Sequence, residues 1–175
     1  MHELFYSPVD VARIIGRNML PITDAMKLTR RIWQEDNAYL QSEYRSDYKK
    51  WALAVMYWSD YMQDKAAMDA EFSAVQEMCG GERSDGSMLR DDFDMDLFFK
   101  DLRIRILFIS KNECVWMKLR TLLDDYGYKR RSREFVRFVK DRLYFYHIQT
   151  ALTGNHICDV ETMDRLDDRI TFRVL

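Results

Sequence analysis

The chain has 175 residues, of which 47% are hydrophobic, 14% aromatic and 32% charged. This composition can build buried cores and excludes a disordered protein. The 6 Gly and 2 Pro residues are too few for the turns of an all-β sandwich, so helices should dominate. With 27 Lys and Arg against 29 Asp and Glu, the net charge of -2 gives no general attraction to nucleic acid or membranes.

Cysteine usage and hydropathy indicate a cytoplasmic protein. The three cysteines are widely spaced and form no CxxC pair, which excludes a disulfide framework and a four-ligand zinc site. The first twenty residues mix charged and apolar side chains, unlike a signal peptide. No stretch approaches the roughly 18 apolar residues that a membrane-spanning helix needs, so we expect no membrane partner.

Capping residues predict two helices near the N-terminus. Ser7 can cap a first helix that has Pro8 at its first position and ends at Gly16. After a turn, Thr23 and Asp24 are expected to cap a second helix. A longer helix should run from about residue 43 to residue 78, with its core-facing stripe formed by Tyr44, Tyr48, Trp51, Ala52, Val55, Trp58 and Met62.

The rest of the chain predicts a flexible passage and a second domain. Glycines and acidic residues between 81 and 100 are typical of a linker that cannot pack. A strand is expected at 102–109, two helices follow, and a strand at 169–174 should pair with the first. The fold class is therefore mainly α with a small β component, divided into a helical domain (1–80), an acidic linker (81–100) and a winged-helix-like domain (101–175).

The N-terminal pair of helices has the pattern of a helix-turn-helix. The run from Phe5 to Gly16 resembles the opening of excisionase-like and other mobile-element DNA-binding domains, and the likeness covers residues 5–33. This resemblance implies that the second helix faces DNA with three basic side chains, Lys27, Arg30 and Arg31. The turn at 17–22 is longer than that pattern has, and an ordinary helical hairpin is the alternative.

A second basic segment lies between residues 129 and 142. Its seven cations are Lys129, Arg130, Arg131, Arg133, Arg137, Lys140 and Arg142. Against Glu134 and Asp141 they give 7 - 2 = +5. Four of the cations fall within an arc of about 80° on a helix whose other side is apolar, an arrangement that suits contact with a phosphate backbone.

Three details qualify this second segment. Tyr126 and Tyr128 precede the helix and could stack on a base or ribose. Arg142 lies on the apolar side, where it needs either a path to solvent or a carboxylate partner. A solvated surface helix without a nucleic-acid partner is the alternative interpretation.

The C-terminal part also resembles a known type of module. The segment from Lys118 to Leu123, the turn from Tyr126 to Ser132 and the segment from Asp168 to Phe172 are similar to a winged-helix-type module of prokaryotic proteins of poorly defined function. The likeness covers residues 115–174. It implies a fold more than an activity.

The sequence gives little basis for catalysis. His2, His147 and His156 have no spacing that suggests a metal site or a nucleophile with its base. The aspartates at 91, 92, 94 and 96 could attract Mg²⁺ or Ca²⁺, but they lack the glycine and terminal Glu of a calcium loop. We therefore predict no enzyme, no metal site and no cofactor, with a metal-dependent enzyme that uses these aspartates as a third hypothesis.

Taken together, the two basic helices predict a DNA-binding protein, either a transcriptional regulator or a mobile-element accessory factor. Phosphate affinity would come from the segment at 129–142, and base reading from the second N-terminal helix. The alternative is an interaction module that forms a homodimer or binds a protein partner through its aromatic helices, without contact to nucleic acid.

Overall fold

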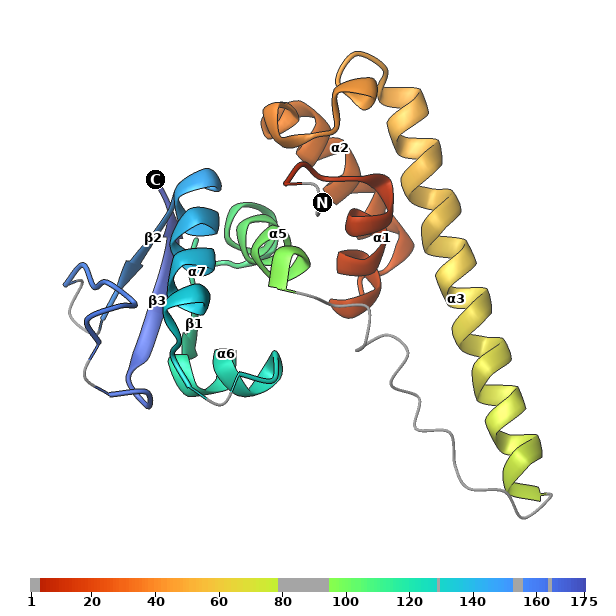
Figure 1. Cartoon of the computed structure of the whole chain (residues 1–175). Coiled ribbons are helices and arrows are strands. Elements are labelled where there is room, and N and C mark those ends of the chain that lie inside the picture. Colours follow the sequence, from red (N-terminus) through yellow and green to blue (C-terminus); the bar gives the residue numbers. More distant parts are fainter. Residues whose placement is uncertain (1–3, 79–94, 129, 153–155, 164) are drawn as a thin grey trace. The chain divides into compact units, whose positions relative to one another are not determined.

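The structure is a computed structural model that describes residues 4–78, 95–128, 130–152, 156–163 and 165–175, without the side chains of residues 65–78. The chain divides into two compact units, Met1–Phe93 (unit 1) and Asp94–Leu175 (unit 2). Its secondary structure is mainly helical with a small antiparallel sheet (Figure 1). The predicted fold class is confirmed at this level.

In its described part, unit 1 consists of helices and their connections, with one isolated β-bridge between Tyr6 and Leu40 (Figure 1). Its elements are α1 (Pro8–Arg17), α2 (Ile22–Glu35), the short 3₁₀ turns η1 (Asn37–Tyr39) and η2 (Ser42–Tyr44), and α3 (Tyr48–Met78). Ser7 caps α1 as predicted: its hydroxyl accepts a hydrogen bond from the Asp10 N–H at 3.1 Å, while the Asp10 carboxylate accepts one from the Ser7 N–H at 2.9 Å.

Three helix boundaries differ from the prediction. Helix α3 begins at Tyr48 rather than near residue 43, so Tyr44 of the predicted stripe lies in η2. Helix α1 continues past Gly16 to Arg17, and Asn18 ends it by donating a side-chain hydrogen bond to the Ile14 carbonyl. Helix α2 begins at Ile22 rather than after Thr23 and Asp24, because Pro21 already holds φ at -58° and its carbonyl accepts the first helical hydrogen bonds.

The core of unit 1 is built around Trp51 of α3. This side chain is fully buried, and its indole N–H donates a hydrogen bond to the Thr29 carbonyl of α2 at 3.1 Å. Val55, one turn further along, is also fully buried, and α1 contributes Val11 and Ile14. The predicted stripe is confirmed at Trp51 and Val55, whereas its other members are only half-buried.

Unit 2 combines helices with a three-stranded sheet (Figure 1). Its elements are α5 (Met95–Ile104), which continues into a π-helical turn (Arg105–Ile109), β1 (Val115–Lys118), α6 (Leu119–Asp125), α7 (Arg133–Phe145), β2 (Ile148–Ala151) and β3 (Arg169–Val174). Strand β3 lies in the middle and pairs antiparallel with both β1 and β2. The predicted strand at 169–174 is therefore confirmed, but its partners differ from the expected one.

The strand predicted at 102–109 is wrong, because this segment is helical. Its alternation is short, whereas helical spacing begins earlier, at Met95, and continues through Phe98, Phe99, Leu102 and Ile106. All five of these side chains are buried. The apolar residues at helical spacing extend over a longer segment than the alternation does, so the segment forms a helix.

The acidic linker at 81–100 also needs correction at its C-terminal end. Residues 95–100 are part of α5, while residues 81–94 lie outside the described part of the chain. The carboxylate of Asp96, counted among the linker acids, accepts a hydrogen bond from Arg142 at 2.6 Å. A paired charge can enter a packed helix at far lower cost than a free one, so the second domain begins before residue 101.

Candidate nucleic-acid interface

Helix α7 is positioned by a side-chain cap and one apolar face. The Ser132 hydroxyl accepts a hydrogen bond from the Phe135 N–H at 3.2 Å, which confirms the predicted start of the helix. Phe135, Val136, Val139 and Leu143 are buried. This apolar face leaves Arg133, Glu134, Arg137 and Asp141 exposed.

Three arginines are open to solvent, two on α7 and one, Arg130, just before it, so Arg130 is not part of the helical arc that the sequence predicted. Arg130, Arg133 and Arg137 are exposed, and within the part of the chain that the structure describes no side chain pairs with them. Glu134 and Asp141 are exposed on the same helix. We call Arg130, Arg133 and Arg137 the α7 arginines, and they are the part of the predicted basic face that remains available to a ligand.

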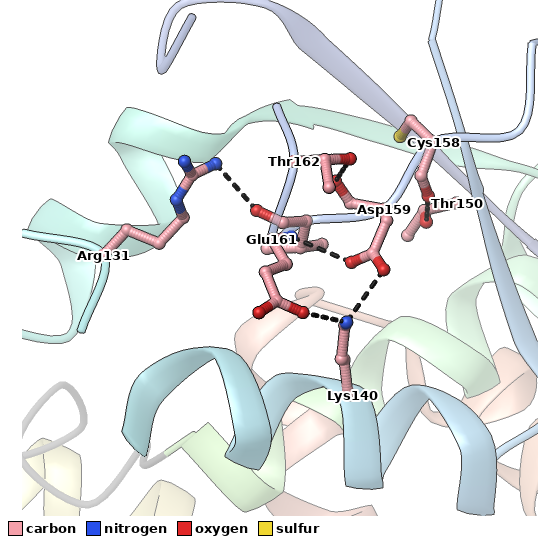
Figure 2. A network of polar contacts seen from close by, with 8 residues as sticks. Arg131, Lys140, Thr150, Cys158, Asp159, Glu161 and Thr162 are labelled. Carbon is pink, nitrogen blue, oxygen red and sulfur yellow. Dashed lines mark hydrogen bonds and ion pairs between the residues drawn. The ribbon is translucent and has the colours of Figure 1, made fainter. Parts of the chain in front are cut away.

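Arg131 and Lys140, predicted as nucleic-acid contacts, have partners inside unit 2 (Figure 2). The Arg131 guanidinium donates hydrogen bonds to the carbonyls of Val160 and Met163 at 2.9 and 2.7 Å. Lys140 forms ion pairs with Asp159, at 2.8 Å, and with Glu161. Both cations hold the β2–β3 loop against α7. The cationic face is therefore smaller than the sequence predicted, because Arg131 and Lys140 are already paired. Lys129 lies outside the described residues.

The Lys140 ion pairs shift the pKa values of both Lys140 and Asp159. Burial raises the pKa of Asp159, but the hydrogen bonds from Lys140 and from the Glu161 N–H, together with the charges of Lys140 and Arg131, outweigh burial and hold this pKa below its ordinary value. Hydrogen bonds to Asp159 and Glu161 raise the pKa of Lys140. The pairing therefore weakens only when pH falls through the lowered pKa of Asp159 or rises through the raised pKa of Lys140, and it persists at neutral pH.

Arg142 has the carboxylate partner that its position requires. Its Nε atom lies 2.6 Å from Asp96 Oδ1, and its guanidinium carbon lies 4.1 Å from the centroid of the Phe138 ring. The Arg142 side chain joins α7 to α5. It is therefore a structural cation of unit 2.

The two tyrosines before α7 pack on other aromatic rings. The centroids of Tyr128 and Phe135 lie 4.8 Å apart, and those of Tyr126 and Phe98 lie 5.6 Å apart. Between them, Gly127 ends α6 with a positive φ of 72°, a conformation that favours glycine. The predicted stacking of these tyrosines on bases stays a prediction.

Helix α2 carries the other predicted contacts. Lys27 lies 3.1 Å from Asp24, and Arg31 donates two hydrogen bonds to the Glu35 carboxylate at 2.9 and 3.1 Å. Arg30 is exposed, and its side chain has no partner among the described residues. All three side chains lie at the surface of unit 1, where ion pairs of this kind contribute little to stability and exchange easily with a ligand.

The sequence analysis missed a further group of exposed residues, on the sheet of unit 2. Trp116 and Lys118 of β1 and Arg169 and Arg173 of β3 are all exposed. The alternation of Arg169, Thr171 and Arg173 was visible in the sequence. Strand β1 was not, because its four residues are too few for periodicity to identify.

Comparisons with models of protein families, with curated proteins and with solved structures give no match for this chain. Among the described residues, no group of three or more His, Cys, Asp or Glu side chains could hold a metal ion. The helices in the described part of the chain include none that is long and apolar enough to cross a membrane. Of the four aspartates in the third hypothesis, only Asp96 is described.

A comparison of neighbouring arginines tests the structural role of Arg131. We expect Arg131→Ala to destabilise unit 2 by about 1–3 kcal/mol, because it leaves the Val160 and Met163 carbonyls without a charged donor. Arg130→Ala removes the same charge from an exposed, unpaired side chain and should change stability by less than about 0.5 kcal/mol. Urea unfolding of both variants measures the difference, and equal stabilities would contradict the assignment.

Proposed function

We propose that the protein binds duplex DNA through unit 2, with α7 as its recognition helix. The observation that carries this proposal is the exposure of Arg133 and Arg137 on a helix whose opposite face is buried, with Arg130 exposed just before the helix. Such a helix can present several positive charges to phosphates while the core fixes its orientation. A transcriptional regulator and a mobile-element accessory factor would both use this arrangement.

The order of elements in unit 2 supports this proposal. A helix and strand β1 are followed by the helices α6 and α7 and then by β2 and β3, with β3 in the middle of the sheet. This order is the one expected of a winged-helix domain, in which α6 and α7 form the helix-turn-helix and the second helix enters the major groove.

The β2–β3 loop supports the same interpretation. It would correspond to the wing, and Arg131 and Lys140 of the helix-turn-helix hold its residues 159–163 next to α7. A loop held beside the recognition helix can reach the backbone next to the groove that the helix occupies. Helix α2, with Lys27, Arg30 and Arg31, would provide a second contact.

Salt dependence tests the proposed function directly. We expect the full chain to bind a labelled 20-base-pair duplex, and its affinity to fall about 40-fold between 50 and 200 mM KCl if three phosphates are contacted, since each contact contributes about 0.9 to the logarithmic slope. Fluorescence anisotropy at several salt concentrations measures this slope. Absence of binding at 50 mM KCl, or an affinity independent of salt, would overturn the proposal.

A second candidate function is a protein-interaction module, which the surface of α3 favours. Leu53, Tyr57 and Tyr61, spaced four residues apart, are 61%, 64% and 50% exposed. Apolar side chains at this spacing form a continuous stripe along a helix. Such a stripe is typical of a surface that binds another helix.

Light scattering distinguishes this second candidate. If α3 forms a homodimer, Tyr57→Glu should convert the dimer to a monomer, because it places a charge in the centre of the exposed stripe. Gln63→Glu adds the same charge at another exposed position of α3 and should leave the dimer intact. A monomer for the unmodified chain at concentrations near 100 μM would count against self-association.

A further inference from the structure

The sheet of unit 2 has one buried and one exposed face. Ile170 and Phe172 of β3 are fully buried, so the alternate residues Arg169, Thr171 and Arg173 point to the other side of the sheet. The register places Trp116 opposite Thr171, Lys118 opposite Arg169 and Gln149 opposite Arg173. Ala151 also lies opposite Thr171 on this side of the sheet, but it is buried. We call the other six residues the outer face.

The aromatic side chain of Trp116 lies at the surface and not in the core of unit 2. It is 57% exposed, although tryptophan is among the residues that gain most from burial. The Arg169 guanidinium carbon lies 4.3 Å from the centroid of its ring. An arginine stacked in this way uses its face for the ring and keeps its N–H groups, which lie in the guanidinium plane, available to an anion.

The charges of the outer face are unbalanced. Lys118 and Arg169 lie directly opposite each other on neighbouring strands, a like-charge pair that destabilises a sheet. Asp167 is a weak counter-charge for Lys118, at 4.0 Å, because its carboxylate already accepts two hydrogen bonds from Arg120. Of the six outer-face residues, three are cations and none is acidic. The surface is therefore complementary to a polyanion.

We propose that the outer face binds single-stranded nucleic acid, with one base stacked on Trp116 and phosphates bound by Lys118, Arg169 and Arg173. A flat aromatic ring surrounded by cations matches a strand that alternates an unpaired base with a phosphate. An acidic peptide would satisfy the charges but supplies no flat ring for Trp116. A duplex keeps its bases stacked and presents only their edges in the grooves, so it offers Trp116 no free base face.

This site is distinct from the α7 arginines and uses other residues. Single-strand binding can therefore be absent while duplex binding is present, and duplex binding can be absent while single-strand binding is present. Both outcomes are separable in the full chain, because the two sets of substitutions do not overlap.

The experiment measures binding of fluorescein-labelled dT12 by anisotropy. Trp116→Ala should weaken this affinity about 5- to 150-fold, which corresponds to the loss of one stacked base. Trp116→Phe keeps an aromatic face and should retain most of the affinity. The pair Arg169→Ala with Arg173→Ala should reduce both the affinity and its salt dependence. None of these variants should alter duplex affinity, and thermal unfolding checks that each variant is folded.

Three controls decide the alternatives. The pair Arg133→Ala with Arg137→Ala should leave dT12 binding unchanged, and loss of binding in that variant would place the strand on α7 and overturn the proposal. An abasic deoxyribose-phosphate oligomer of the same length should bind as weakly as dT12 binds the Trp116→Ala variant, and equal affinity of both oligomers for the unmodified chain would contradict base stacking. Competition by polyglutamate as effective as that by dT12 would reassign the surface to acidic peptides and overturn the proposal.

Discussion

Replacing the three α7 arginines with alanine is expected to remove most of the salt dependence of duplex binding. Arg130, Arg133 and Arg137 are exposed and free of intramolecular partners among the described residues, so each can displace a counterion from a phosphate. Three lost contacts lower the logarithmic salt slope by about 2.7. At 50 mM KCl we expect at least about a tenfold loss of affinity, measured by anisotropy with the 20-base-pair duplex.

The matched control removes three cations from unit 1 instead. Replacing Lys27, Arg30 and Arg31 of α2 with alanine changes the net charge by the same amount and alters exposed side chains on another helix. A larger effect of this control than of the α7 variant would move the main DNA contact to α2. If neither variant changes the slope, duplex binding through the two predicted helices is rejected.

The features that sequence reasoning located correctly are local ones. Ser7 and Asp10 are three residues apart and cap α1 reciprocally as predicted, and the Ser132 hydroxyl caps α7 through a single hydrogen bond from the Phe135 N–H. The apolar face of α7 follows from a helical period within thirteen residues. Helix caps and apolar faces depend on residues that are close in the sequence, so they can be predicted without a structure.

Two of the errors concern contacts between distant parts of the chain. Arg131 and Lys140 were expected to face a ligand, but their partners lie 19 to 32 residues away, in a loop whose position no local pattern indicates. The outer face was missed for the same reason, since strand pairing brings Trp116 next to Arg169. The alternation at 102–109 is a separate, local error: it predicted a strand, although the helical spacing that begins at Met95 runs into this segment and makes it helical.

The largest effect on stability is expected for Trp51→Ala in unit 1. The Trp51 side chain is fully buried and packs edge-on against Tyr44, with ring centroids 5.7 Å apart. Its loss creates a large cavity and removes the donor to the Thr29 carbonyl, so unit 1 should lose about 3–5 kcal/mol. This is a large part of the roughly 5–15 kcal/mol that stabilises a typical domain. Urea unfolding followed by circular dichroism measures it.

Two further substitutions separate packing from hydrogen bonding. Trp51→Phe keeps an aromatic ring but still leaves the Thr29 carbonyl without its donor, so we expect a smaller loss of about 1–3 kcal/mol. Tyr57→Ala, on the exposed side of the same helix, should change stability by less than about 0.5 kcal/mol. A Trp51→Ala variant as stable as Tyr57→Ala would contradict the described core.

The Trp51→Ala variant also separates the two units in function. The α7 arginines and the outer face both belong to unit 2, which has its own buried core centred on Phe135, Ile170 and Phe172. Since the outer face lies in unit 2, loss of structure in unit 1 should leave the affinity for dT12 within about threefold of the unmodified chain, whereas duplex affinity should fall only by the second contact that α2 contributes. A parallel loss of duplex binding and of unit 1 structure, with dT12 binding retained, would instead assign the duplex contact to α2.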